Sequence, residues 1–273
     1  MRELHLGISP CPNDTWIFHG LLRETVKVAG CHLKITLADI EELNSGLRAQ
    51  RFDVAKASFA AVADLAESHV LLPAGAALGI GVGPVLLARD EATAIHVRNP
   101  RVLLPGENTT ATLLWRAFHG DLGAQEKHVS FDKIMPMLAA GSAELGVCIH
   151  EGRFTWQERG FHLMEDLGAR FEARFKLPLP LGGLFARKDL GSPVHRALTE
   201  AIRRSMAEAR AHPLAALKTQ RAHAQELDDA VIRKHVNLYV NSFTENIGTA
   251  GMEAVAGLAT LMQKSLPPLA EMH

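Results

Sequence analysis

The chain has 273 residues, of which 47% are hydrophobic and 22% charged, and its formal net charge is −1. This length suits about two ordinary domains, and the composition excludes a disordered chain, a collagen and a coiled coil. A chain so close to neutrality has no overall field that would attract a nucleic-acid backbone or an anionic membrane, and no concentrated basic patch is visible. We therefore expect no nucleic-acid partner.

The cysteines and the first residues indicate a cytoplasmic protein. Cys11, Cys31 and Cys148 are an odd and sparse set that suits a reducing compartment and no disulfide framework. The opening MRELHLGISPCPND has neither the apolar core nor the small-residue cleavage site of a secretory signal. No stretch approaches the roughly 20 uninterrupted apolar residues of a spanning helix, so we expect no membrane insertion.

Short β-rich runs alternate with helical patterns over the first two thirds of the chain. The predicted strands are Leu4–Ile8, Leu33–Leu37, Val54–Ala57, Val82–Ala88, Arg101–Leu104, Leu145–Ile149 and Gly183–Ala186. The predicted helices between them are Trp16–Val26, Glu41–Arg48, Ala60–Glu67, Ala111–Phe118 and Lys133–Ala139. Strands separated by helices predict βαβ units and an α/β fold with mainly parallel sheets.

The last third is helical almost throughout, from Pro193 onward. Pro213 is expected to begin a new helix at its first turn, and Pro267 and Pro268 to end the last one. The segments GPVLLARD (83–90) and GGLFARKD (182–189) share a glycine, an apolar strand, Ala-Arg and an acid. Two such strands are typical of the crossings between two lobes, but a chance likeness of short apolar strands explains them equally well.

Short polar turns follow four of the predicted strands. Ligands of open α/β sheets bind beyond the carboxyl ends of the strands, so these turns are the first places to search for a site. In the first turn, Ser9–Thr15, Asn13 or Asp14 fits the N-cap of the next helix, and capping is the favoured role. Cys11 has no basic or histidine neighbour in sequence that would activate a thiolate.

The second turn closes the strand Val54–Ala57. Ser58 fits the N-cap of the next helix. Alternation with Val54 favours a buried or cleft-facing position for Lys56, although a surface position is the default for a lysine.

The third turn, PGENTTA at 105–111, combines a glycine with two hydroxyls at a predicted helix start. Such a start forms a cradle for a carboxylate or phosphate, and simple capping is an equal alternative. The fourth turn, CIHEGR at 148–153, places His150 at the end of an apolar strand beside an acid and Arg153. An imidazole in that position is typical of proton transfer, because it gains or loses a proton near neutral pH.

Metal and cofactor motifs are absent from the sequence. There is no His-x-x-x-His or Cys-x-x-Cys spacing, and the turn at 105–111 lacks the lysine of a P-loop. The glycine cluster at 75–83 does not open a helix, as a dinucleotide fingerprint must. We therefore expect no metal and no organic cofactor.

The segments SPCPNDTWIFHGLL, GVGPVLLAR, PGENTTATLL, IHEGRFTW and LPLPLGGLFARKDLG together resemble the 1,4-dihydroxy-6-naphthoate synthases of menaquinone biosynthesis. The resemblance runs in order from about residue 3 to about residue 245. Trp16 stands where the family commonly has Phe, and Gly152 where it commonly has Ser. Neither departure touches a residue to which we assign a role.

The resemblance implies a fold and a reaction. The fold is the two-lobed periplasmic-binding-protein type II fold, each lobe a mainly parallel sheet flanked by helices, with a ligand cleft between the lobes. Residues 1–88 and 188–273 would form the first lobe, and residues 89–187 the inserted second lobe. The reaction is carbon–carbon cleavage of cyclic dehypoxanthinylfutalosine, a small-molecule carboxylate, to 1,4-dihydroxy-6-naphthoate and dihydroxyacetone, without a metal or organic cofactor.

The resemblance also implies roles for individual residues. The general base falls on His150. Substrate contacts fall on Lys56, Ala57, Ser58, Thr110 and Ala111. Position in the motifs adds Asn13, Asp14, Thr109 and Arg153 as residues that line the cleft.

Three other functions fit the same fold. The first is a non-catalytic carboxylate-binding protein, which the missing signal peptide disfavours. The second is chorismate dehydratase of the same pathway, which does not resemble the SPCPNDT and IHE-x-RF segments. The third is an inactive sensor of a pathway intermediate, which the presence of His150 disfavours. The motifs predict no oligomeric state.

Overall fold

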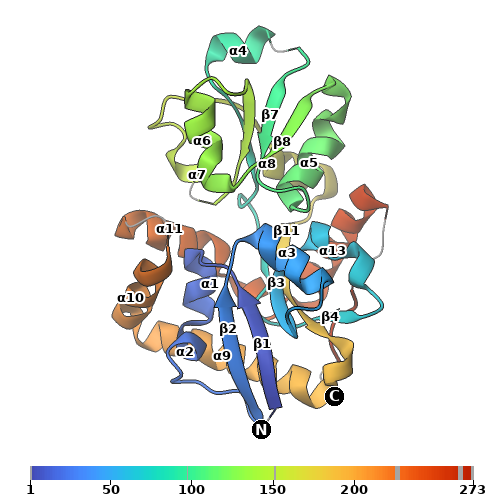
Figure 1. Cartoon of the computed structure of the whole chain (residues 1–273), viewed down its shortest axis with the longest axis vertical. Coiled ribbons are helices and arrows are strands. Elements are labelled where there is room, and N and C mark those ends of the chain that lie inside the picture. Colours follow the sequence, from blue (N-terminus) through green and yellow to red (C-terminus); the bar gives the residue numbers. More distant parts are fainter. Residues whose placement is uncertain (1, 97, 151, 225–227, 264–266, 272–273) are drawn as a thin grey trace. The chain divides into compact units, whose positions relative to one another are not determined.

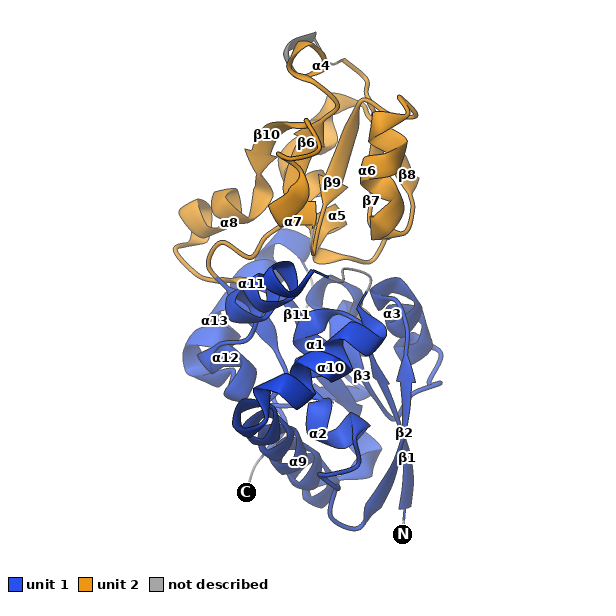
Figure 2. Cartoon of the chain, turned by 90° about the vertical axis from the view of Figure 1, so that its left-hand side faces the viewer, with its two compact units in different colours: residues 1–79, 180–273 blue, residues 80–179 orange. Residues whose placement is uncertain are grey.

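A computed structural model describes residues 2–96, 98–150, 152–224, 228–263 and 267–271 (Figure 1). The chain forms two compact units, which are coloured separately in Figure 2. Unit 1 combines residues 1–79 and 180–273, and unit 2 consists of residues 80–179. Each unit contains one β-sheet with helices packed on it, so the predicted α/β class is confirmed.

Unit 1 is built on a six-stranded sheet with the order β2-β1-β3-β11-β4, in which β5 also pairs with β11. Its strands are β1 (Arg2–Ile8), β2 (Cys31–Leu37), β3 (Val54–Ser58), β4 (His69–Leu71), β5 (Ala77–Gly79) and β11 (Leu179–Arg187). Strand β1 runs parallel to both β2 and β3, with Leu6 opposite Val54. The turns that follow β1 and β3 therefore leave the same edge of the sheet.

The helices of unit 1 cover this sheet and include most of the C-terminal third. They are α1 (Pro12–Ile17), α2 (His19–Leu22), α3 (Ile40–Arg48), α9 (Ser192–Ala211), α10 (Pro213–His223), α11 (Asp229–Tyr239), α12 (Ser242–Glu245) and α13 (Gly248–Met262). Their starts follow ordinary helix chemistry. Pro12 and Pro213 open helices in the first turn, where a missing N–H costs nothing, and Asp39 caps α3 by accepting from the Glu41 N–H at 2.9 Å.

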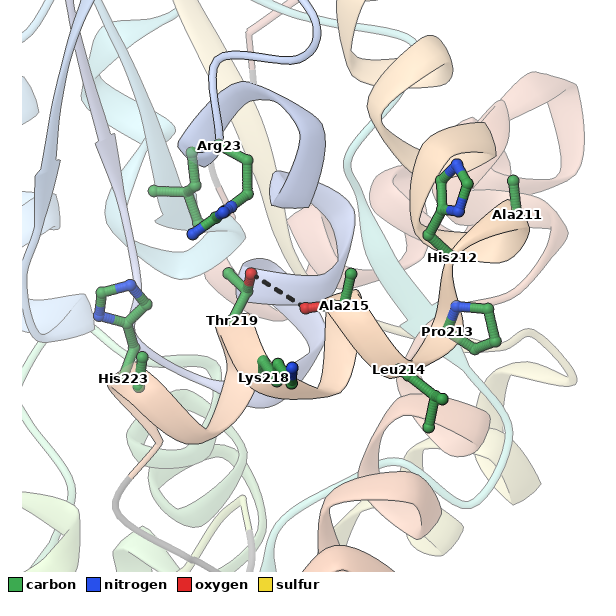
Figure 3. A pocket seen from close by; sticks show the side chains of 11 residues that line it. Arg23, Ala211, His212, Pro213, Leu214, Ala215, Lys218, Thr219 and His223 are labelled. Atoms are coloured by element: carbon green, nitrogen blue, oxygen red, sulfur yellow. Dashed lines mark hydrogen bonds between the residues drawn. The ribbon is translucent and has the colours of Figure 1, made fainter.

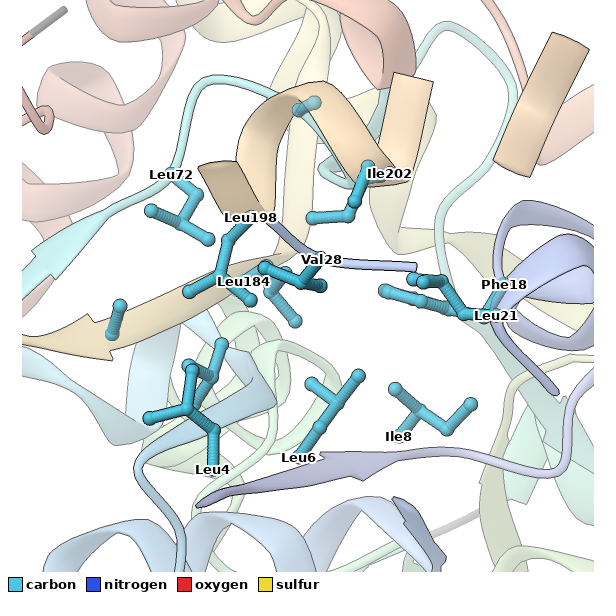
Figure 4. Packing of buried hydrophobic residues seen from close by; sticks show 14 of the residues in the cluster. Leu4, Leu6, Ile8, Phe18, Leu21, Val28, Leu72, Leu184, Leu198 and Ile202 are labelled. Atoms are coloured by element: carbon cyan, nitrogen blue, oxygen red, sulfur yellow. The ribbon is translucent and has the colours of Figure 1, made fainter. Parts of the chain in front are cut away.

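The core of unit 1 lies between β1 and α9. Leu4, Leu6 and Ile8 alternate along β1 and point to one face of the sheet, where Leu198 and Ile202 of α9 meet them (Figure 4). All five side chains are at most 1% exposed. Burial of a side chain of this size contributes about 1.5–3 kcal/mol, so this contact fixes the face of β1 that looks inward. The turn after β1 is thereby held in place.

Unit 2 is built on a five-stranded sheet with the order β10-β6-β9-β7-β8. Its strands are β6 (Val85–Ala88), β7 (Arg101–Leu104), β8 (Gln125–His128), β9 (Leu145–Cys148) and β10 (His162–Asp166). Its helices are α4 (Glu91–His96), α5 (Thr110–His119), α6 (Phe131–Ala139), α7 (Gly152–Thr155) and α8 (Leu167–Phe175). Strands β7 and β9 are parallel neighbours, so the turns after them also leave one edge together.

The boundaries between the units differ from those expected from the sequence. Strand β6 pairs with β9 and β10 and so belongs to unit 2, whereas the expectation placed it in the first lobe. Strand β11 pairs with β3 and β4 and so belongs to unit 1, whereas the expectation placed it in the second. The division therefore falls at 79/80 and 179/180 rather than at 88/89 and 187/188.

Three predicted helices differ from the observed elements. The predicted helix Trp16–Val26 starts earlier, at Pro12, and is divided into α1 and α2 at Phe18. Cys11 occupies the N-cap position, so the predicted capping role of Asn13 or Asp14 is wrong. In place of Ala60–Glu67 the chain forms two 3₁₀ turns, η1 (Phe59–Ala61) and η2 (Ala63–Leu65). The last helix ends at Met262, because Gln263 adopts a left-handed conformation with φ of 53°. Pro267 and Pro268 therefore do not end it.

Two glycines of unit 2 meet at a close backbone contact. A Cβ atom placed on Gly83 would lie 2.2 Å from the Cα atom of Gly168, and one placed on Gly168 would lie 2.5 Å from the Cα atom of Gly83. Both neighbours are main chain, so a side chain at either position requires the backbone to move. This contact joins the start of β6 to the first turn of α8.

We expect Gly83→Ala to destabilise the protein by at least about 1–3 kcal/mol, the usual cost of overpacking, because no flexible side chain is available to give way. Thermal unfolding followed by calorimetry measures the effect. Gly120→Ala is the matched control, since a Cβ atom there has nothing within 4 Å and φ is −63°. Equal melting temperatures for the two variants would contradict the close contact.

Candidate functional site

The turn after β1 is organised by the carboxylate of Asp14, which is 1% exposed. Its Oδ2 accepts from the Ser9 hydroxyl at 2.8 Å and from the Ser9 N–H at 3.3 Å. Its Oδ1 accepts from the Asn13 amide at 3.0 Å and from the Lys56 ammonium at 2.9 Å. Four donors occupy the acceptor positions of this carboxylate, so Asp14 holds the turn together and has little capacity left for a ligand.

Lys56 is buried on β3, only 4% exposed, and is therefore not the surface lysine that is the default for its type. Its Nζ donates to Asp14 Oδ1 at 2.9 Å and to the Gly75 carbonyl at 2.7 Å. An ammonium has three N–H donors, and the described part of the chain supplies acceptors for two of them. One donor of a buried cation is therefore left for a ligand or solvent.

Asn13 connects this pair to a residue that sequence reasoning missed. The ring nitrogen Nε2 of His235, on α11, lies 2.9 Å from Asn13 Oδ1. His235 is fully buried. It stands in the middle of an ordinary amphipathic helix, 222 residues from Asn13, and no local pattern distinguishes it from the other histidines.

Ser58 ends β3 and begins the turn η1, as its predicted capping role requires. Its hydroxyl accepts from the Ala60 N–H at 3.3 Å, and its own N–H donates to Asn44 Oδ1 at 3.0 Å. Ala57 is fully buried, and a Cβ atom on the neighbouring Gly182 would lie 2.7 Å from the Ala57 carbonyl oxygen. The end of β3 is thus packed tightly against β11 and is rigid.

In unit 2, the helix start after β7 is shaped by Gly106 and two threonines. Gly106 has φ of 107°, a conformation that favours glycine. Thr109 is the N-cap of α5, where its hydroxyl accepts from the Thr112 N–H at 3.2 Å. The hydroxyls of Thr109 and Thr112 both donate to the Gly106 carbonyl, at 3.1 and 2.6 Å.

These bonds hold the first turn of α5, which contains Thr110 and Ala111, in one geometry. Both residues are buried, each 3% exposed. The first N–H groups of a helix have no partner within the helix and carry partial positive charge, which favours an anion at this end. The structure therefore has the helix start that the sequence predicted.

His150 follows β9 and is half-buried. Its backbone is left-handed, with φ of 53°, a conformation that costs a non-glycine residue about 1–2 kcal/mol. Its ring packs edge-on against Phe131, with 4.7 Å between the ring centroids. Such outliers concentrate at functional sites, where the surrounding structure enforces them. Glu151, the next residue of the motif, lies outside the described residues.

Arg153 is engaged within unit 2. One guanidinium nitrogen donates to Asp166 Oδ2 at 2.6 Å, and another donates to the Gly83 carbonyl at 2.7 Å. Asp166 also caps α8 by accepting from the Ala169 N–H at 2.9 Å. Arg153 thereby ties α7 to β10 and α8, which is a structural task, and its backbone N–H also donates to the His150 carbonyl at 3.2 Å.

Cysteine and metal chemistry receive no structural support from the described residues. Burial raises the pKa of Cys148 to about 12, so this residue is a neutral thiol near pH 7. Within the described ranges, no group of three or more His, Cys, Asp or Glu side chains is placed to hold a metal ion. In the same residues, no helix combines the length and the apolar character that crossing a membrane requires.

A surface hollow of about 720 Å³ lies elsewhere in unit 1, beside α2 and α10 (Figure 3). It holds none of the site residues predicted from the sequence. Its lining includes Arg23, His212, Lys218 and His223. Thr219 also lines it, and the Thr219 hydroxyl lies 2.9 Å from Nδ1 of the buried His19, whose pKa is lowered by burial.

The structure thus brings the predicted residues together in two groups, each at the carboxyl edge of one sheet. In unit 1, Asn13, Asp14 and Lys56 bond to one another, and Ser58 follows on the same strand. In unit 2, the start of α5 and His150 follow the neighbouring parallel strands β7 and β9. The fixed cation of unit 1 suits the binding of an anion. In unit 2, the helix start also suits an anion, and the histidine suits the transfer of a proton.

Comparisons with known proteins agree with the observed fold. A protein of Archaeoglobus fulgidus with a known crystal structure is 27% identical and superposes with a TM-score of 0.88, covering 96% of this chain and 97% of that one. A Candida albicans protein that exhibits the generic periplasmic-binding-protein fold has a TM-score of 0.69 at 11% identity, covering 97% and 92%. The predicted periplasmic-binding-protein-like fold is therefore confirmed.

Two curated relatives are similar over nearly their whole lengths, and both are named 1,4-dihydroxy-6-naphthoate synthase. The relative from Thermus thermophilus is 46% identical over 258 residues, which are 94% of this chain and 93% of the relative. The relative from Streptomyces coelicolor is 41% identical over 261 residues, 94% of this chain and 92% of the relative. A family model described as menaquinone biosynthesis matches residues 4–264. The chain belongs to this menaquinone-biosynthesis family.

Proposed function

We propose that this protein is a 1,4-dihydroxy-6-naphthoate synthase, a lyase that cleaves cyclic dehypoxanthinylfutalosine to 1,4-dihydroxy-6-naphthoate and dihydroxyacetone. The similarity to two synthases over 94% of the chain supports the product. The observation that carries the chemistry is the conformation of His150, which has φ of 53° and follows the end of β9. Strand β9 pairs with β7, the strand that precedes α5. A strained histidine at a sheet's carboxyl edge is suited to proton transfer.

In this proposal His150 is the general base. Cleavage of the carbon–carbon bond requires removal of a proton, and the electron pair of the broken bond becomes enolate-like charge on the substrate. The imidazole in its neutral form takes that proton, and positioned donors stabilise the charge. The edge-on contact with Phe131 limits the orientations of the ring, which supports a fixed direction of transfer.

The remaining predicted residues bind the substrate. The first turn of α5, with Thr110 and Ala111, supplies N–H groups and a hydroxyl for a carboxylate. Ser58 supplies a hydroxyl, and Lys56 supplies the cation of unit 1. Binding by groups on rigid elements orients the substrate toward the base.

A binding protein without catalysis is the second candidate, because the chain shares its fold with a ligand-binding component of an import system, at a TM-score of 0.70 and 12% identity. Such a protein would use the same anion-binding groups and would have no need of a base. The product assay below separates the two functions.

Incubation of the purified protein with cyclic dehypoxanthinylfutalosine is expected to release 1,4-dihydroxy-6-naphthoate, detected after chromatography. We expect His150→Asn to form product at least about 100-fold more slowly, the usual contribution of a general base. Asparagine tolerates positive φ, so this variant removes the base and keeps the backbone. His162→Asn, at a half-buried histidine on β10, is the control and is expected to keep wild-type activity.

Full activity of His150→Asn would place the base elsewhere. Binding of the substrate by folded wild-type protein without any product would contradict the synthase and support the binding protein.

Ser58→Ala and Thr110→Ala are each expected to raise KM by about 10-fold or more and to change kcat less than threefold. Each hydroxyl is proposed to bond a charged group in substrate and transition state alike, and such a bond is worth about 1.5–3 kcal/mol. Steady-state kinetics on each variant measures the split. Ser130→Ala, at the exposed start of α6, controls for loss of a serine at a helix start. A fall in kcat at unchanged KM would assign the hydroxyl to the transition state instead.

A further inference from the structure

A continuous line of buried side chains connects α11 to β3 through the turn after β1. His235 Nε2 lies 2.9 Å from Asn13 Oδ1, Asn13 Nδ2 lies 3.0 Å from Asp14 Oδ1, and the same oxygen lies 2.9 Å from Lys56 Nζ. All four residues are at most 6% exposed. The line ends on Lys56, which carries a spare donor.

The chemistry of the groups fixes the direction of every bond in this line. An ionised carboxylate only accepts, so the Asn13 atom that faces Asp14 is the NH₂ group. The other amide atom, which faces His235, is therefore the oxygen, and His235 Nε2 carries the hydrogen that it donates. A reversed Asn13 amide would place its oxygen against the Asp14 carboxylate and its NH₂ group against the donor on His235. The His235 donor therefore favours the orientation in which Asn13 donates to Asp14.

The fixed Asp14 carboxylate in turn orients the ammonium of Lys56. Its ammonium is fixed by Asp14 on one side and by the Gly75 carbonyl on another, which leaves one N–H pointing in a set direction. With the Cε–Nζ bond and two N–H bonds fixed, the tetrahedral geometry of the ammonium leaves the third donor a single direction. A cation held in this way meets developing negative charge without reorganising, which is the condition for strong electrostatic stabilisation.

We propose that Lys56 donates its third N–H to the substrate oxygen that gains negative charge when the carbon–carbon bond breaks, and that His235, through Asn13 and Asp14, is the residue that positions it. This rests on the synthase function proposed above. His235 itself touches no substrate in this account. Its contribution is to hold the Asn13 amide, and thereby the Asp14 carboxylate, in the orientation that aims the ammonium.

A purely structural role for His235 makes different predictions, and paired variants separate the two. His235→Leu removes the donor, whereas glutamine carries an N–H near the position of Nε2, so His235→Gln retains it. We expect His235→Leu to lower kcat by about 10- to 100-fold with KM changed less than threefold, because small misplacements have effects of this size. His235→Gln is expected to restore kcat to within about threefold of wild type.

Lys56→Gln removes the cation and keeps donors for Asp14 and for the Gly75 carbonyl. It is expected to lower kcat by about 10²–10³-fold, as the loss of one transition-state donor does. If His235 acts through Lys56, then His235→Leu has no further effect on kcat in the Lys56→Gln background. An effect of full size in both backgrounds would overturn the proposal, as would a loss of stability in His235→Leu with unchanged kcat per folded molecule.

A second readout needs no turnover and so distinguishes failure of this inference from failure of the proposed function. Nitrogen-edited NMR of the lysine ammonium groups is expected to show a slowly exchanging signal for Lys56 that is absent from Lys56→Gln. We expect this signal to shift or broaden in His235→Leu and to return in His235→Gln. An unchanged Lys56 signal in His235→Leu overturns the positioning role even if wild-type protein forms no product.

Discussion

The ion pair between Asp14 and Lys56 is the contact on which the candidate site of unit 1 depends. Burial of two charges is costly, and their attraction offsets the cost only when the remaining hydrogen-bonding capacity is also satisfied. Here the side chains are 1% and 5% exposed and the charged atoms are 2.9 Å apart. Ser9 and Asn13 donate further hydrogen bonds to the carboxylate, and the Gly75 carbonyl accepts a hydrogen bond from the ammonium. The pair thereby ties the turn after β1 to the middle of β3.

The polar groups of unit 2, like those of unit 1, lie at the carboxyl edge of a sheet. Strands β7 and β9 are parallel neighbours, so the turns that follow them carry the start of α5 and His150 away from one edge. In unit 1 the turn after β1 carries Asp14, and Lys56 lies within the neighbouring parallel strand β3. Each unit thus presents these polar groups at the carboxyl edge of its sheet, where the hydrogen bonding between strands ends. Unit 1 offers a fixed cation, and unit 2 offers a helix start and a histidine.

The buried strands were predictable from the sequence, because the apolar pattern is strong in such strands. The observed β1, β3, β7 and β9 lie within two residues of the predicted strands, since each of them contains buried Val, Leu or Ile side chains. The capping roles of Ser58 and Thr109 were also predictable, because a hydroxyl at a helix start has a local physical reason.

Other features have no local signal. Strand β8, Gln125–His128, is exposed and polar at every position, and only its pairing with β7 makes it a strand. The unit boundaries depend on which strands β6 and β11 pair with, and both read simply as apolar segments. His235 reaches Asn13 across 222 residues of sequence, so its bond exists only after α11 has packed on α1. Tertiary packing decides all three.

The central claim, that a buried pair organises the site of unit 1, is tested most directly by the free energy of unfolding of Asp14→Asn. This variant leaves Lys56 buried without its counter-charge, and we expect a loss of about 3–5 kcal/mol. Glu42→Gln is the control, because Glu42 and Arg51 form an exposed pair at 3.7 Å, and such pairs contribute less than about 1 kcal/mol. A loss in Asp14→Asn no larger than that in Glu42→Gln would contradict the account.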